Sequence, residues 1–95
     1  MSRFLARIVM DNAGESEYHD LHIFMEAVGY KRWIAGSNGR RLHLPDAMYL
    51  YEGKANSETA FALAQMPCKE VGLKHSIVLT SAEPLTYLGL KEVDP

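Results

Sequence analysis

The sequence predicts an α+β domain built from an antiparallel sheet and two helices. Three observations carry this prediction. Two segments repeat apolar residues at helical spacing, several short runs are rich in strand-forming residues, and a Gly-Ser-Asn-Gly turn separates two of those runs. The 95 residues have room for one hydrophobic core, so we expect a single domain over residues 1–95.

The first third of the chain predicts a strand followed by a helix. Residues 4–10 form an apolar run in which Phe4, Ala6, Ile8 and Met10 alternate with a mixed set that contains Arg7. We expect the apolar set to face the helices and Arg7 to lie on the opposite face of the sheet or at its rim. The helix follows over residues 15–28. Asn12 and Glu15 have the spacing of a capping box, and Ser16 is a second candidate for the N-cap. Gly29 is a stop signal.

The middle of the chain predicts a hairpin. Residues 31–35 form its first strand and residues 36–39 its turn, where Asn-Gly supplies residues that tolerate a positive φ. The return strand divides at Pro45, which cannot donate to a ladder. Its first half therefore lies at an edge or a bulge, and residues 47–51 form the stronger strand.

The last third predicts a second helix and a final strand. Ser57 is the expected N-cap, Pro67 ends or kinks the helix, and Gly72 closes the segment. Residues 75–80 form the last full strand, and residues 85–90 a short extra strand at an edge. With right-handed crossovers the order β-α-β-β-α-β predicts a ferredoxin-like sandwich. Both helices then cover one face of the sheet and leave the other face open.

Composition excludes several classes of protein. No apolar run approaches the ~20 residues that span a bilayer, and the first residues lack the pattern of a signal peptide. A single cysteine, Cys68, excludes an internal disulfide and is typical of a buried structural thiol in a reducing, cytoplasmic protein. The net charge of −2 disfavours a protein that coats nucleic acid with its whole surface. Acids cluster over residues 11–26, whereas residues 27–45 carry only basic charges.

The basic segment is the candidate RNA site. His43 with Arg40 and Arg41 could supply proton transfer and phosphate binding for metal-free RNA cleavage. The expected RNA contacts combine aromatic side chains that stack on bases with cations that bind phosphates: Arg7, Lys31, Arg32, Trp33, Tyr49 and Tyr51. The alternative is a basic hairpin rim with tyrosines in the sheet. The two readings require different orientations of Tyr49 and Tyr51: tyrosines that point at the helices belong to the core, whereas tyrosines on the opposite face could contact RNA.

Two other groups could hold a metal ion. Asp11 follows the first strand, where a carboxylate paired with its copy across a dimer could hold Mg²⁺ for phosphodiester hydrolysis; the alternative is a turn aspartate. His19 and His22 lie one helical turn apart on the acidic helix, between Glu15 and Glu26. Two histidines without a third ligand residue are more typical of a solvated helix surface.

Four segments together resemble the family grouped with the GhoS antitoxin, the endoribonuclease antitoxins of type V toxin–antitoxin systems. They are FLARIVM, YHDLHIFMEAVGY, GSNGRRLHLPDAMYLYEG and SIVLT. The resemblance covers about residues 3–90. That family is similar in fold to the VapD interferases and to the small ferredoxin-like nuclease of CRISPR adaptation. The resemblance implies a homodimer formed through the sheets that cuts single-stranded regions of messenger RNA.

Two functional hypotheses follow. The first is a small RNA-binding homodimer that acts as an endoribonuclease antitoxin. The second is a non-enzymatic, dimeric interaction module in which the acidic helix and the basic hairpin meet a partner protein or each other. Neither the RNA target nor a toxin partner can be read from the sequence.

Overall fold

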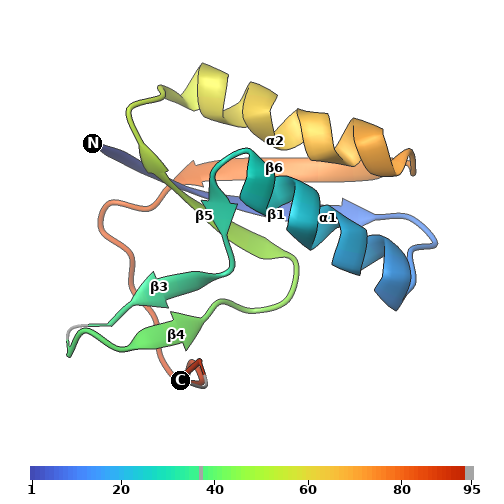
Figure 1. The fold of residues 1–95 in the computed structure, drawn as a ribbon. Helices are drawn as coiled ribbons and strands as arrows, with labels where there is room; N and C mark the ends of the chain where they lie inside the picture. The colour runs from blue at the N-terminus through green and yellow to red at the C-terminus, as the bar shows by residue number, and fades with distance from the viewer. Residues whose placement is uncertain (37, 94–95) are drawn as a thin grey trace.

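The computed structural model describes residues 1–36 and 38–93. Within these residues the chain forms two helices and six strands (Figure 1). The elements are β1 (Ser2–Met10), α1 (Glu15–Ala27), β2 (Tyr30–Lys31), β3 (Trp33–Ala35), β4 (Arg41–His43), β5 (Met48–Gly53), α2 (Ser57–Val71) and β6 (His75–Ser81). In this described part of the chain, neither helix is both long and apolar enough to cross a membrane.

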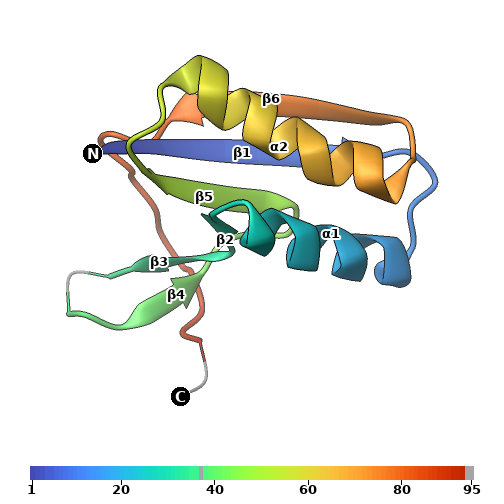
Figure 2. The ribbon, with the colours of Figure 1, turned by 45° about the horizontal axis from the view of Figure 1, so that its top comes forward.

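The main sheet has four antiparallel strands in the order β2-β5-β1-β6. Strand β1 is central and pairs with β5 on one side and β6 on the other. Because β1 and β2 are both antiparallel to β5, the α1 connection links two parallel strands that are not neighbours; α2 links β5 and β6 in the same way. Both helices lie on one face of the sheet (Figure 2).

The helix face of the sheet carries the larger core. Ala6, Ile8 and Met10 of β1 point at the helices and pack with Leu21 and Met25 of α1. From α2 the core receives Ala64 and Cys68, and the free Cys68 thiol is fully buried, as the sequence predicted. Burial in this apolar site raises the pKa of the thiol to about 11.

The opposite face of the sheet is not left open along its whole width. Leu5 and Leu50 point away from the helices and pack with Ile34, Leu44 and Ala82 in a second core. Ile34 belongs to the β3–β4 hairpin and Ala82 to the segment after β6, so these two segments cover Leu5 and Leu50. The prediction of an uncovered face was therefore wrong for the β5 side. It was correct for Arg7, which is exposed on this face opposite Val78 of β6.

The predicted first strand of the hairpin is in fact two strands. Tyr30 and Lys31 pair with β5 in the main sheet, whereas Trp33 to Ala35 pair with β4 in a separate two-stranded sheet. The chain bends at Arg32, whose carbonyl accepts a hydrogen bond from the Leu44 N–H at 2.8 Å. The bend brings Ile34 under the sheet, where only 1% of its surface is exposed. Burying an isoleucine side chain stabilises the fold by about 1.5–3 kcal/mol.

The return strand divides at Pro45, as predicted: β4 precedes the proline and β5 follows it. The predicted extra strand over residues 85–90 was wrong. Gly89 has a φ of 78°, which interrupts an extended backbone, and Leu85 and Leu90 pack irregularly against the second core. The chain beyond it runs along β4, with hydrogen bonds from His43 N–H to the Lys91 carbonyl and from Val93 N–H to the Arg41 carbonyl.

The helix starts differ from the prediction by one or two residues. Gly14, not Asn12, occupies the N-cap position of α1, because Asn12 has a φ of 58° in the turn after β1. Asn56, not Ser57, caps α2, and its side chain accepts a hydrogen bond from the Thr59 N–H at 2.8 Å. Helix α2 continues through Pro67 and ends at Gly72, which has a φ of 84°.

Candidate nucleic-acid interface

The β3–β4 hairpin has two chemically different faces. Trp33 lies opposite His43 in the ladder and Ala35 lies opposite Arg41, so these four residues share the outer face. Ile34 and Leu42 alternate with them and pack into the second core. The turn is closed by hydrogen bonds from Gly36 N–H to the Arg40 carbonyl and from Gly39 N–H to the Gly36 carbonyl. Ser37, which the sequence placed in this turn, lies outside the described residues.

Two cations lie against the Trp33 ring. Lys31 Nζ and Arg41 Cζ are each 4.2 Å from a ring centroid of the indole. Such contacts are attractive because the face of an indole ring carries partial negative charge. The outer face of the hairpin therefore combines a partly exposed aromatic ring, two cations and the exposed imidazole of His43.

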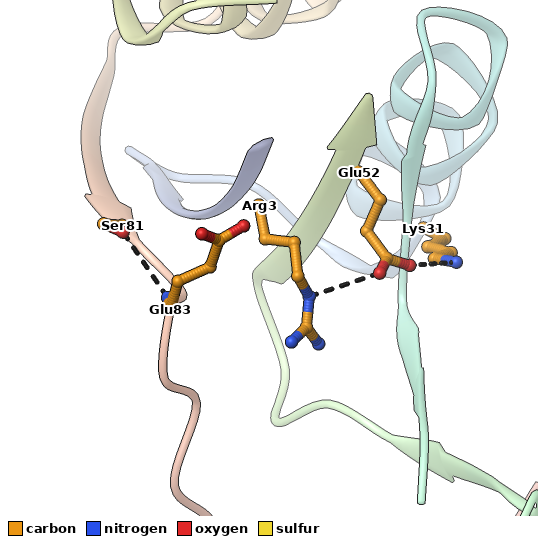
Figure 3. Close-up of polar contacts among 5 residues, drawn as sticks. All are labelled: Arg3, Lys31, Glu52, Ser81 and Glu83. Carbon is orange, nitrogen blue, oxygen red and sulfur yellow. Dashed lines mark hydrogen bonds and ion pairs between the residues drawn. The ribbon is translucent and has the colours of Figure 1, made fainter. Parts of the chain in front are cut away.

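Lys31 also forms an ion pair with Glu52 of β5 (Figure 3). Its Nζ lies 2.5 Å from Glu52 Oε1, and Arg3 Nε lies 3.2 Å from Glu52 Oε2. The Arg3 contact is an ion pair that is not aligned as a hydrogen bond. One carboxylate on β5 thus sits between cations from β1 and β2. At the end of β6, the Glu83 N–H donates to Ser81 Oγ at 3.4 Å (Figure 3).

Arg40 does not join the group around Trp33. Its Nη1 donates to Glu92 Oε1 at 2.8 Å, and this hydrogen bond raises the pKa of the guanidinium. Both side chains are well exposed, so the pair ties the start of the hairpin's return strand to the C-terminal segment only weakly. Of the residues expected to act in cleavage, the fold places Arg41 and His43 on one face and turns Arg40 to a carboxylate.

Tyr49 and Tyr51 point at the helices and belong to the core. Tyr49 is fully buried, and its Oη lies 2.7 Å from Nδ1 of His22. The Tyr51 ring packs on Tyr30, with centroids 5.5 Å apart, and its hydroxyl accepts a hydrogen bond from the Ala55 N–H. The orientation question thus resolves in favour of the core, and neither ring is part of the surface around Trp33.

The remaining predicted residues lie apart from one another. Arg7 is exposed on the uncovered part of the sheet, and Arg32 is exposed at the bend between β2 and β3. Asp11 is exposed beyond the end of β1, and its backbone N–H donates to the Lys74 carbonyl at 2.8 Å. Within residues 1–36 and 38–93, no three His, Cys, Asp or Glu side chains are grouped closely enough to hold a metal ion.

An open hollow beside α1 was not predicted from the sequence. It lies between the first half of this helix and the loop before β5, and its lining includes Tyr18, His19, His22 and Asp46. Burial lowers the pKa of His22, as do the nearby positive charges of Arg32 and His19, while Asp46 acts in the opposite direction. Helical spacing placed both histidines on one helix surface, but no sequence signal connected His22 with Tyr49, which is 27 residues further along the chain.

The chain was compared with models of known protein families and with curated proteins, and it matches none of either. The resemblance to the GhoS-like antitoxins therefore stays a prediction from the sequence.

Proposed function

We propose that this protein binds single-stranded RNA through the outer face of the β3–β4 hairpin. The observation that carries the proposal is the Trp33 ring with Lys31 and Arg41 each 4.2 Å from it. An aromatic ring next to cations is the usual means of binding unpaired nucleotides, because the ring stacks on a base while the cations neutralise phosphates. Stacking of one base contributes about 1–3 kcal/mol.

In this proposal Arg41 is the cation that moves when RNA binds. Lys31 is held by Glu52, whereas the exposed Arg41 makes no ion pair within the part of the chain that the structure describes. A base that stacks on Trp33 takes the place of the Arg41 guanidinium. The guanidinium then becomes free to bind the phosphate of the same nucleotide in the bidentate manner that arginine favours.

We further propose that the domain is ferredoxin-like, with the hairpin inserted between its second and third sheet strands. The sheet order β2-β5-β1-β6 and the two crossovers through α1 and α2 support this assignment. The insertion is what gives the hairpin a surface separate from the sheet. The antitoxin role that the family resemblance implies rests on the resemblance alone.

The proposal extends to binding and stops short of cleavage. Metal-free cleavage of RNA requires one group to accept the 2′-hydroxyl proton and another to protonate the leaving oxygen. Among the described residues of the hairpin's outer face, His43 is the one histidine, and it can fill one of these two roles. A second such group would have to come from elsewhere, so cleavage enters as an outcome of the experiment.

The single tryptophan makes the test direct, because Trp33 reports on its own site. Titration with a 12-nucleotide single-stranded RNA at low salt is expected to quench its fluorescence. Anisotropy of labelled RNA should show at least about tenfold weaker binding for Trp33→Ala, as loss of one stacked base implies. Arg41→Gln should weaken binding and flatten the salt dependence by about 0.7 in log–log slope, since one phosphate contact is lost.

Arg40→Gln is the matched control, because it removes the neighbouring arginine that already pairs with Glu92. Equal losses for Arg40→Gln and Arg41→Gln, or fluorescence that RNA leaves unchanged, would contradict the proposed site. The same RNA is followed on a denaturing gel with and without EDTA. Shortened products that disappear with His43→Ala extend the proposal to metal-free cleavage, whereas products lost only in EDTA direct attention to Asp11.

A further inference from the structure

We propose that two copies of this chain pair through the free edge of β6 and form one continuous eight-stranded sheet. Strand β6 is the last strand in the order β2-β5-β1-β6, and β1 occupies one of its two sides. Along residues 1–36 and 38–93 no strand pairs with its other side, which forms a border of the sheet in Figure 2. A free edge seven residues long exposes a row of backbone donors and acceptors.

The composition of β6 does not protect this edge. Natural proteins guard free edges with charged side chains, prolines, bulges or very short strands. The β6 sequence HSIVLTS has no Pro, Gly, Lys, Arg, Asp or Glu, and its pairing with β1 runs without a bulge. The other edge strand of the same sheet, β2, is two residues long and carries Lys31. One edge is therefore guarded and the other is suited to pairing.

The backbone of β6 fixes which groups point outward. Just outside the two ends of the strand, the Lys74 carbonyl accepts from Asp11 N–H and the Ala82 N–H donates to the Arg3 carbonyl, both towards β1. Since successive residues of a strand point their backbone groups to opposite sides, the even-numbered residues bond to β1. The odd-numbered residues point outward: His75, Ile77, Leu79 and Ser81. Each presents one N–H and one C=O.

These outward groups match a second copy of themselves. An antiparallel pairing that overlaps all of β6 has its two-fold axis at Val78, the middle residue of His75–Ser81. Ile77 then lies opposite the partner's Leu79, and His75 lies opposite the partner's Ser81. Both are pairs of the type in which two residues exchange two hydrogen bonds. Every outward N–H of one strand meets an outward C=O of the other, and a shift in register leaves some of them unpaired.

The side chains are compatible in the same register. Val78 meets the partner's Val78 on the face away from the helices, and Ser76 meets the partner's Thr80 beside it. No pair of like charges is opposed, because the two copies of His75 lie at opposite ends of the ladder. Val78 is 64% exposed in the single chain, and Ile77 and Leu79 are only partly buried at the border of the core. A second β6 would cover these apolar side chains.

The pairing leaves the hairpins free. A two-fold axis perpendicular to the sheet keeps the helices of both copies on one face and places each β2 at an outer edge of the joined sheet. With strands about 4.8 Å apart, the two β2 strands lie about 34 Å from each other. The surfaces around Trp33 are thus remote from the axis, and the two proposals can succeed or fail separately.

A disulfide tests the register. Residues opposite each other in a pair without hydrogen bonds have Cα atoms about 4.5 Å apart, which lies within the range that a disulfide spans. Val78→Cys should form a covalent dimer under mild oxidation on a non-reducing gel, since the native Cys68 is buried. Ser76→Cys is the matched control: its own copy is four residues away along the ladder, about 13 Å, and it should cross-link slowly.

Charged side chains introduced at Val78 test the association without a covalent bond. Light scattering after size exclusion should show a concentration-dependent dimer for the unmodified chain. Val78→Lys and Val78→Glu should each raise its dissociation constant at least about tenfold, because like charges would face each other across the axis. An equimolar mixture of the two variants should recover the dimer. Ile23→Lys, on the exposed surface of α1, makes the same change of charge away from β6 and should leave the dimer intact.

Three results would overturn the proposal. The first is a chain that remains a monomer at every concentration, and the second is cross-linking of Ser76→Cys as fast as that of Val78→Cys. The third is a mixture of the Lys and Glu variants that stays monomeric. Circular dichroism of each variant separates loss of pairing from loss of fold, and substitution of the exposed Val78 should leave the spectrum unchanged.

Discussion

The hydroxyl oxygen of Tyr49 lies 2.7 Å from Nδ1 of His22, and this contact joins strand β5 to helix α1. Complete burial raises the pKa of the Tyr49 hydroxyl well above its usual range, so the hydroxyl keeps its proton. It can donate a hydrogen bond to Nδ1 when His22 is neutral with its proton on Nε2, and the His22 ring lines the hollow along α1. Tyr49 is part of the buried core, whereas the His22 ring is partly exposed.

We expect Tyr49→Phe to lower the free energy of unfolding by about 1–2 kcal/mol, because the half-buried His22 nitrogen loses its donor while the ring volume is retained. Urea denaturation at pH 7.5 measures the change. Tyr87→Phe removes a hydroxyl from a side chain that is 42% exposed, and it should be nearly neutral. Equal effects of the two substitutions would contradict a stabilising role for the contact.

Acid should weaken the fold through His22. The pKa of His22 is lowered in the folded chain, first by burial and then by Arg32 and His19, from an ordinary value of 6.5. The unfolded chain therefore takes up this proton at a higher pH than the folded chain. The stabilisation is complete above about pH 6.5 and is lost as the pH falls below it.

The measurement compares urea denaturation of the unmodified chain and of His22→Gln at pH 7.5 and pH 5.5. Glutamine can still accept the hydrogen bond from Tyr49 but does not titrate, so its loss of stability should be smaller. His19→Gln, one turn earlier and exposed, is the comparison: it removes one of the charges that lower the pKa of His22, so its acid response should be weaker than that of the unmodified chain but still present. An identical acid response of all three chains would exclude His22 as the cause.

High pH should lower the stability of the fold through ionisation of Tyr30. Its hydroxyl is buried and donates to the Ala60 carbonyl at 2.7 Å, and burial raises its pKa from 10.0 to about 12. Because the folded pKa lies above the unfolded one, this contribution is complete below about pH 10 and is lost as the pH rises towards 12. Thermal unfolding between pH 8 and pH 11.5 should show a steeper decline for the unmodified chain than for Tyr30→Phe. Parallel curves would show that another group dominates.

Glu52 should contribute more than Glu92 to the free energy of unfolding, although both pair with an arginine. Glu52 lies between Arg3 and Lys31 with about a third of each side chain exposed, whereas Glu92 pairs only with the well-exposed Arg40. We expect Glu52→Gln to cost about 1 kcal/mol and Glu92→Gln less than about 0.5 kcal/mol in urea denaturation, since exposed ion pairs contribute little. In 1 M NaCl the difference should shrink. Equal costs at low salt would contradict the arrangement in Figure 3.

Local pattern predicted the elements well and their mutual arrangement poorly. Helical spacing located both helices, and strand-forming runs located β1 and β6 within two residues, because those signals lie within each segment. The division at Pro45 was also predictable, since proline removes a donor wherever it stands. The break at Arg32 was not predictable, because the residues on either side of it fit one continuous strand as well as two strands in different sheets. That choice depends on Leu44 and Leu50, which come later in the chain.

The candidate site was predictable in composition and not in orientation. The sequence brought Lys31, Trp33, Arg41 and His43 together because they lie on one hairpin. It could not say which face Tyr49 occupies, because alternation separates two sets of residues without saying which set meets the helices. The pairing of Tyr49 with Ala6 of β1 decides the question, and register between distant strands is not a local property.

Ala47 offers a test in which the direction of the effect is unusual. It has a φ of 64°, in the left-handed region, at the turn before β5, where its carbonyl accepts a hydrogen bond from Ile8 N–H at 3.0 Å. An L-residue with a Cβ costs about 1–2 kcal/mol in this conformation and glycine does not, although glycine also loses more entropy on folding. We therefore expect Ala47→Gly to stabilise the chain by up to about 1 kcal/mol. Ala62→Gly, at an exposed position inside α2, should destabilise it by about 1 kcal/mol. Urea denaturation of both variants gives the signs, and a loss of stability in both would show that Ala47 does not adopt a left-handed backbone in solution.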